Sequence, residues 1–284
     1  MPDNILFYLL FSTQLILLSY YYPSKIIKRI RLVHQLCPRE THPRLYSQAN
    51  VNYDKGLQKY RLANAIILVL GVVLMFFVGY WDSQSVGKTG EAFPIFFGLF
   101  QFMPFFFMEF LGFKELRNMR NNDQRKIKKA DLKPRLFSQY APMNLVGLTI
   151  ASYLLCIGFE LYIADSVWQM KTLTIIITLT LCNLLYMGII FWHLHGNKLD
   201  PYQSSDDRRR QTKIIIKSLL ITSIATSVYF TGTAALQHFQ LERFEITLNC
   251  FYMLIIAVVG VGFLLKEIRV EEINFDVYKA DYKA

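Results

Sequence analysis

The chain has 284 residues, of which 53% are hydrophobic and 18% are charged. Soluble domains carry roughly 25% charged residues, so the sequence is short of the polar residues that would cover a water-soluble core. The net charge of +10 would suit a nucleic-acid partner. However, the basic residues stand beside long apolar runs, where the positive-inside rule of membrane proteins places them. We therefore exclude an ordinary soluble domain and expect no nucleic-acid partner.

The apolar runs are long enough to cross a bilayer as helices. A hydrocarbon core of about 30 Å needs about 20 apolar residues in a helix. Seven such runs occur, so we predict an all-α, polytopic transmembrane bundle that forms one integral membrane domain over 1–284. The predicted spans are 5–22, 61–80, 93–113, 142–164, 172–192, 214–236 and 246–265.

The first run begins close to the N-terminus, as a signal peptide would. It is followed at once by Lys25 and Lys28, and no small-residue cleavage site closes it. We therefore expect an uncleaved anchor helix rather than a removed signal.

The basic residues alternate from loop to loop. Three arms, 23–60, 114–140 and 193–213, hold most of the 31 Lys and Arg, whereas each loop between them holds one. The positive-inside rule then places these arms and the tail 266–284 in the cytoplasm, with the N-terminus outside. We expect a multi-pass protein of the bacterial cytoplasmic (inner) membrane.

A short motif, Pro-Arg-Leu-aromatic-Ser-Gln, begins at Pro43 and again at Pro134, each time before a predicted span. A looser version at 200–204 precedes a third span. This spacing predicts three parallel two-helix repeats after the anchor helix. Each motif would form an interfacial elbow whose arginine reaches lipid phosphate. Alternatively, the arginines surround a site for anionic lipid or a partner; the candidates are Arg44, Arg135, Arg208 and Arg209.

Few polar side chains inside the predicted spans could form a site. Glu109 and Glu160 are the two acids there, and an ionisable group in hydrocarbon should face protein or water. Pro104 lies between Gln101 and Glu109 and should kink that span as a hinge. The candidate substrate or ion path consists of Gln101, Glu109, Asn144, Asn183 and Glu160.

These residues also have structural interpretations. Glu109 is close to Lys114 and could form an interfacial ion pair, while Glu160 could extend toward the nearer membrane surface. The asparagines could hydrogen-bond between helices. Close helix packing would equally explain the hydroxyls of the sixth span, which are Ser218, Thr222, Ser223, Thr226, Ser227, Thr231 and Thr233.

The sequence carries no HExxH, P-loop or GxSxG motif, so we expect no enzyme. Its four cysteines have no CxxC spacing, and we expect neither a metal site nor a cofactor.

Two functions remain. The first is a small transporter or channel that moves a small solute or ion along a polar path between the third and seventh spans. The alternative is a non-catalytic subunit or scaffold that docks other membrane subunits or anionic lipid headgroups through its basic arms. Convergence of the polar residues would favour the first function, and scattered, locally bonded polar groups would favour the second.

Overall fold

The computed structural model describes residues 2–46, 53–83, 93–123, 136–164, 170–196 and 200–279. All regular structure in these ranges is helical. Seven of the helices are long and apolar enough to cross a membrane. The predicted class, an all-helical multi-pass membrane protein with seven spans, is confirmed by the length and composition of these helices.

Each long helix corresponds to one predicted span, and two are interrupted by a π-helical segment. The first comprises α1 (Pro2–Ile16), η1 (Leu17–Tyr21) and α2 (Tyr22–Leu36), and the last comprises α8 (Glu245–Ala257), η5 (Val258–Gly262) and α9 (Phe263–Glu267). The others are α3 (Tyr53–Ser83), α4 (Phe93–Asn121), α5 (Met143–Ile163), α6 (Met170–His195) and α7 (Ser205–His238).

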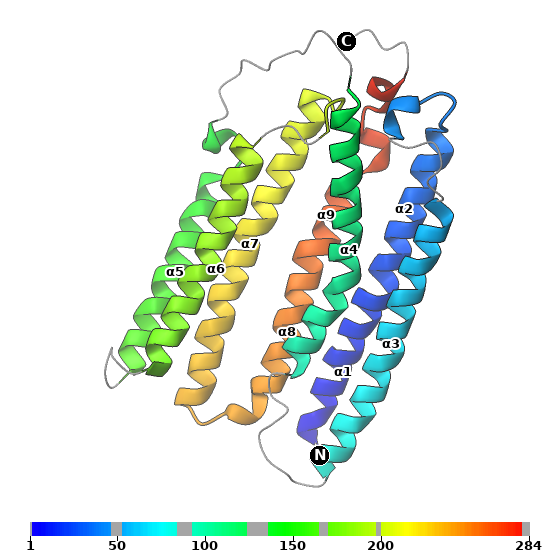
Figure 1. Ribbon diagram of the computed structural model, residues 1–284. Coiled ribbons are helices and arrows are strands. Elements are labelled where there is room, and N and C mark those ends of the chain that lie inside the picture. Colours follow the sequence, from blue (N-terminus) through cyan, green and yellow to red (C-terminus); the bar gives the residue numbers. More distant parts are fainter. Residues whose placement is uncertain are drawn as a thin grey trace.

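The helices are divided into two packed groups (Figure 1). The first bundle consists of the first helix, α3, α4 and the α8–α9 helix, with α1 packed against α8. The second group is a layer in which α5 and α6 pack mainly on α7. The helix α7 also contacts α8. It therefore joins the two groups.

Several helices continue past the predicted spans into the segments described above as arms. The first helix ends at Leu36 rather than near Tyr22, and α3 begins at Tyr53. Hydropathy marks only the part that lies in hydrocarbon, whereas a helix can continue through polar residues. Pro23 is tolerated in this helix because the π-helical turn η1 directly precedes it, and such local adjustments accommodate the missing N–H.

The core of the first bundle is aromatic. Phe11 is fully buried and packs against Phe97, with ring centroids 5.7 Å apart. Lipid tails are as apolar as these rings, so close packing rather than water exclusion holds membrane helices together. Gly71 lets α3 approach this cluster: a Cβ atom there would lie 2.9 Å from Phe97 Cζ.

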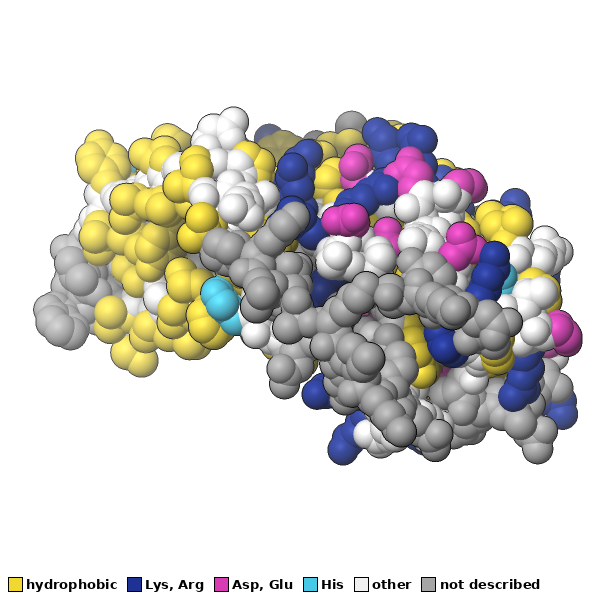
Figure 2. Space-filling view, turned by 90° about the horizontal axis from the view of Figure 1, so that it is seen from above, with side chains coloured by type: hydrophobic (Ala, Val, Ile, Leu, Met, Phe, Trp, Pro, Cys, Tyr) yellow, Lys and Arg dark blue, Asp and Glu magenta, His cyan; other side chains and the backbone are white. Residues whose placement is uncertain are grey.

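The C-terminal ends of α2, α4 and α6 and the N-terminal ends of α3, α5 and α7 lie at one end of the molecule, which we call the basic end (Figure 1). Lys and Arg side chains, with Asp and Glu among them, gather on it over the first bundle (Figure 2). The described side chains over α5 and α6 are mainly hydrophobic in the same view.

Short turns after α9 fold back over the basic end. Tyr278 is buried, and its hydroxyl donates a hydrogen bond to Asp200 Oδ2. Burial and the nearby Asp200 carboxylate raise the pKa of Tyr278, so the phenol keeps the proton that it donates. Its ring contacts that of Tyr202, over which the Arg44 guanidinium lies at 5.6 Å. The C-terminal turns thus connect the loop before α7 with the loop before α3.

We expect Tyr278→Ala to make the C-terminal turns more sensitive to trypsin. The substitution removes both the hydrogen bond to Asp200 and the ring contact, and a loss of about 1–2 kcal/mol raises an open population roughly 5- to 30-fold. Limited proteolysis with mass detection of cleavage after the exposed Arg269 measures the effect. Tyr278→Phe keeps the ring and should show a smaller increase. Cleavage of Tyr278→Ala at the wild-type rate would contradict this role.

Candidate functional site

Gln101 lies in the first bundle and is fully buried. Its Oε1 accepts a hydrogen bond from Gln14 Nε2 at 2.9 Å, and its Nε2 donates to Ser19 Oγ at 2.9 Å. The chain of amides therefore joins α4 to α1 and η1. No described residue gives Gln14 Oε1 a hydrogen-bond partner.

Asn183 lies in the other group, between α6 and α7. Its Oδ1 accepts a hydrogen bond from Ser223 Oγ, and its Nδ2 donates to the Leu179 carbonyl at 2.9 Å. Asn183 and Gln101 therefore bond to different helices.

Asn183 belongs to a row of polar contacts that continues along α7, which we call the polar seam. Its members come from α6, α7 and α8 and are Asn183, Tyr186, Ser223, Thr226, Tyr229, Asn249 and Tyr252. None of these side chains is a carboxylate or a base. Ser223, Thr226 and Asn249 are buried, with Thr226 only 1% exposed, and the other members are partly buried.

Thr226 is the centre of the seam. Its hydroxyl donates to the Thr222 carbonyl at 2.9 Å, as expected for a threonine inside a helix. The phenol oxygens of Tyr186 and Tyr252 lie 3.2 and 3.1 Å from Thr226 Oγ1. Because the threonine proton is already used, both phenols must donate to its two lone pairs. One hydroxyl thus joins α6, α7 and α8.

Tyr229 extends the seam toward the end of α7. Its ring is stacked on that of Tyr252, with centroids 4.2 Å apart, and its hydroxyl donates to Asn249 Oδ1 at 2.9 Å. Aromatic stacking and the hydrogen bond fix α8 against α7 at this level.

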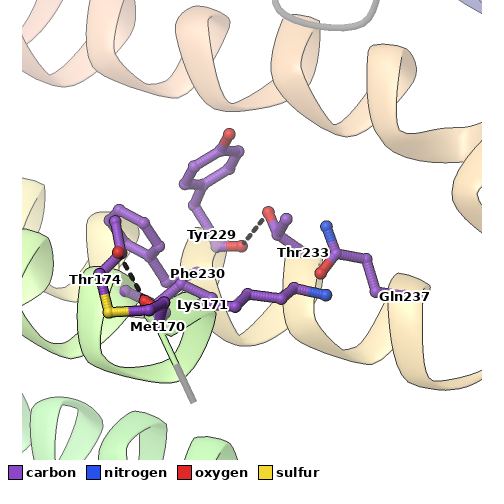
Figure 3. Close-up of a pocket in the computed structure, with 8 residues that line it drawn as sticks. Met170, Lys171, Thr174, Tyr229, Phe230, Thr233 and Gln237 are labelled. Carbon is purple, nitrogen blue, oxygen red and sulfur yellow. Dashed lines mark hydrogen bonds between the residues drawn. The ribbon is translucent and has the colours of Figure 1, made fainter. Parts of the chain in front are cut away.

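A pocket of about 380 Å³ opens where α6 begins and α7 ends, at the end of the molecule opposite the basic end. Figure 3 shows the Lys171 side chain extending toward Thr233 and Gln237, whereas the ring of Tyr229 points away from Lys171. The lining residues are Met170, Lys171, Thr174, Ile175, Tyr229, Phe230, Thr233 and Gln237. Tyr229 therefore belongs to both the pocket and the polar seam. A pocket of this size accepts a small ligand.

Glu160 lies on α5 and is 3% exposed, so it does not extend toward the membrane surface as one interpretation predicted. Within the part of the chain that the structure describes, its Oε1 has no hydrogen-bond partner. Lys171, a pocket residue, lies at the start of α6, which packs beside α5.

The other two predicted path residues lie on the outside of the molecule. Glu109 on α4 and Asn144 on α5 are both exposed. Asn144 Oδ1 accepts a hydrogen bond from the Leu145 N–H, a local contact at the start of α5. The structure thus does not bring the five predicted path residues together.

The predicted hinge Pro104 is buried inside α4, which continues through it. Its neighbours Phe102 and Phe105 pack on the first helix and α8. Whether Pro104 acts as a hinge remains a prediction.

The predicted arginines are at the basic end where the structure describes them. Arg44 contacts Tyr202, and Arg208 donates to the Gly196 carbonyl at 2.7 Å. Arg209 is partly exposed on the first turns of α7. Arg135 lies outside the described residues. The two motif copies differ locally, because a 3₁₀ turn begins at Pro43 in the first and at Phe137 in the second. The internal repeat therefore remains a prediction.

Sequence reasoning missed the partners that make these polar groups a site. The hydroxyls of α7 were identified from the sequence, but Tyr186 and Tyr252, whose phenols contact Thr226, were not. Gln14 could have been identified as a candidate partner from the sequence, because it is an amide in the first apolar run, just as Gln101 is in the third.

No family model matches the chain, and neither the curated proteins nor the solved structures include a significant match to it. Among the described residues, no group of three or more His, Cys, Asp or Glu side chains could hold a metal ion.

Proposed function

We propose that the protein moves a small uncharged solute along the polar seam, with the pocket as its entrance. The observation that carries this proposal is the continuity of the seam with the pocket through Tyr229. Polar side chains are scarce in membrane helices, and a row of them between three helices suits a pathway.

The chemistry of the seam favours a solute without net charge. Its hydroxyls, phenols and amides can exchange hydrogen bonds with a solute hydroxyl or amide, but none can neutralise an ion. An ion would lose its hydration without a counter-charge, which costs several kcal/mol in a buried site. Lys171 at the pocket also disfavours cations.

In this proposal, the pathway is closed in the present structure. Ser223 is 2% exposed and the Thr226 hydroxyl is fully bonded, so no solute passes while α6 and α8 both contact α7. Opening would separate one of these helices from α7, and solute groups would replace the phenols as partners of Thr226. Hinge or shear movements of this kind are the usual repertoire of transporters.

We place the basic end in the cytoplasm, the N-terminus and the pocket outside, and the protein in a bacterial inner membrane. The distribution of Lys and Arg supports this orientation. In this arrangement the solute enters from outside.

We expect Thr226→Val to lower the flux of small uncharged solutes by about tenfold, because losing about 1.4 kcal/mol of stabilisation slows a step tenfold. Purified protein is reconstituted in liposomes, and light scattering follows the entry of glycerol and urea. Thr13→Val is the matched control, since Thr13 is an exposed threonine on α1 with its own backbone hydrogen bond. Wild-type flux equal to that of empty liposomes for both probes would end the proposal.

A second function, a non-catalytic subunit of a larger membrane assembly, is favoured by the basic end. Its Lys and Arg are exposed together over the first bundle, where they can meet anionic headgroups or an acidic partner (Figure 2). The locally bonded Gln101 also suits a structural protein. Mass measurement after purification in mild detergent tests it: a lone protomer without a copurifying protein counts against this function.

A further inference from the structure

We propose that Glu160 is a proton-binding site that controls a solute-binding residue, Lys171. This inference rests on the proposed function and couples solute binding to the binding of a proton. When Glu160 is ionised, it holds the Lys171 ammonium; when it is protonated, the ammonium turns to an oxygen of the solute in the pocket.

The position of Glu160 is unusual for a residue with only a structural role. It is 3% exposed and lies within one of the seven candidate spans, and one carboxyl oxygen has no hydrogen-bond partner among the described residues. Buried polar groups are almost always bonded, and an exception calls for an explanation such as a functional role. A carboxyl oxygen without a fixed hydrogen bond can gain or lose a proton without breaking such a bond.

Among the described residues, Lys171 is the one Lys or Arg of α6. It lies at the start of that helix, which packs beside α5, and Glu160 lies near the end of α5. Cys156 lies on α5, one turn before Glu160, and interacts with Thr231 on α7. The titratable groups on the outer part of α7 are Tyr229, whose hydroxyl is bonded to α8, and the exposed His238. Lys171 is therefore the charged partner that can respond to Glu160.

Lys171 links the two events because it also lines the pocket. Its side chain extends toward Thr233 and Gln237, on the pocket side (Figure 3). The carboxylate and a solute oxygen compete for the same ammonium. Protonation of Glu160 with a proton from the external water neutralises one competitor, and deprotonation returns that proton to water. Proton binding and solute binding then favour each other to the same degree, as linkage requires.

The test measures glycerol entry into liposomes as a function of pH. Wild-type flux should rise as the pH falls, by at most about tenfold per pH unit, the limit for one titrating group. Glu160→Gln imitates the protonated state, so it should keep a high flux that no longer depends on pH. Glu160→Asp should restore the dependence. Glu109→Gln is the matched control, an equal change at an exposed acid on α4, and should behave as wild type.

Infrared titration of the purified protein supplies a readout that needs no flux. Acidification should add the carbonyl band of a protonated carboxylic acid, and Glu160→Gln should lack that band while Glu109→Gln keeps it. An unchanged pH profile in Glu160→Gln would overturn the coupling while leaving the proposed function in place. Absence of flux in wild type would remove both, and absence of the infrared difference would overturn proton binding itself.

Discussion

The Gln101→Leu variant is expected to unfold at a markedly lower temperature than wild type in mild detergent. Leucine fills similar space but leaves the Gln14 amide and the Ser19 hydroxyl without the partners that they have in the native protein. Each buried polar group left unbonded costs about 1–3 kcal/mol, although hydrogen bonds between membrane helices average about 0.6 kcal/mol and reach about 1.7. Two lost bonds therefore predict a destabilisation of about 1–3 kcal/mol.

A double-mutant cycle separates the hydrogen bond from simple packing. Gln14→Leu combined with Gln101→Leu removes both amides, so the pair should be less destabilised than the two single changes added together. Gln58→Leu, at an exposed glutamine on α3, is the matched control and should leave the melting temperature unchanged. Strict additivity of the two buried substitutions would contradict the amide chain.

The positions of the spans could be predicted because run length and loop charge depend only on local composition. All seven predicted spans coincide with helices of the structure. The helix ends could not be predicted in the same way. The first helix continues through Pro23 to Leu36, since η1 accommodates the proline and polar residues can remain helical beyond the hydrocarbon.

The candidate site was less accessible to sequence reasoning. Gln101, Asn183 and Glu160 were identified as polar groups in apolar surroundings; Gln101 and Glu160 are buried, and Asn183 is partly buried. Their partners depend on which helices are neighbours, and no local pattern contains this information. Gln101 meets Gln14, 87 positions earlier, and Asn183 meets Ser223, 40 positions later.

The same limitation explains why one polar path was expected where the structure has two separate polar groups. The amide chain holds the first bundle together, whereas the polar seam lies between α6, α7 and α8. Only α7 contacts both groups of helices extensively. A movement of the α5–α7 layer relative to the first bundle would therefore change the polar seam and leave the amide chain intact.

Close packing around Gly71 gives the second large effect that we expect. In Gly71→Leu, the new Cβ atom would overlap Leu15 Cδ2 and lie 2.9 Å from Phe97 Cζ, inside the aromatic core of the first bundle. Overpacking of this kind typically costs 1–3 kcal/mol, because neighbouring side chains must leave their preferred rotamers.

Thermal unfolding can be measured by the exposure of a buried cysteine to a thiol-reactive dye. Cys250 is fully buried in the same cluster, so a thiol-reactive dye should label it at a lower temperature in Gly71→Leu than in wild type. Gly188→Leu on α6 is the matched control, because no atom lies within 4 Å of a Cβ built there and leucine is a better helix former than glycine. It should melt at or above the wild-type temperature. Equal melting of the two variants would mean that α3 does not approach the first helix at Gly71.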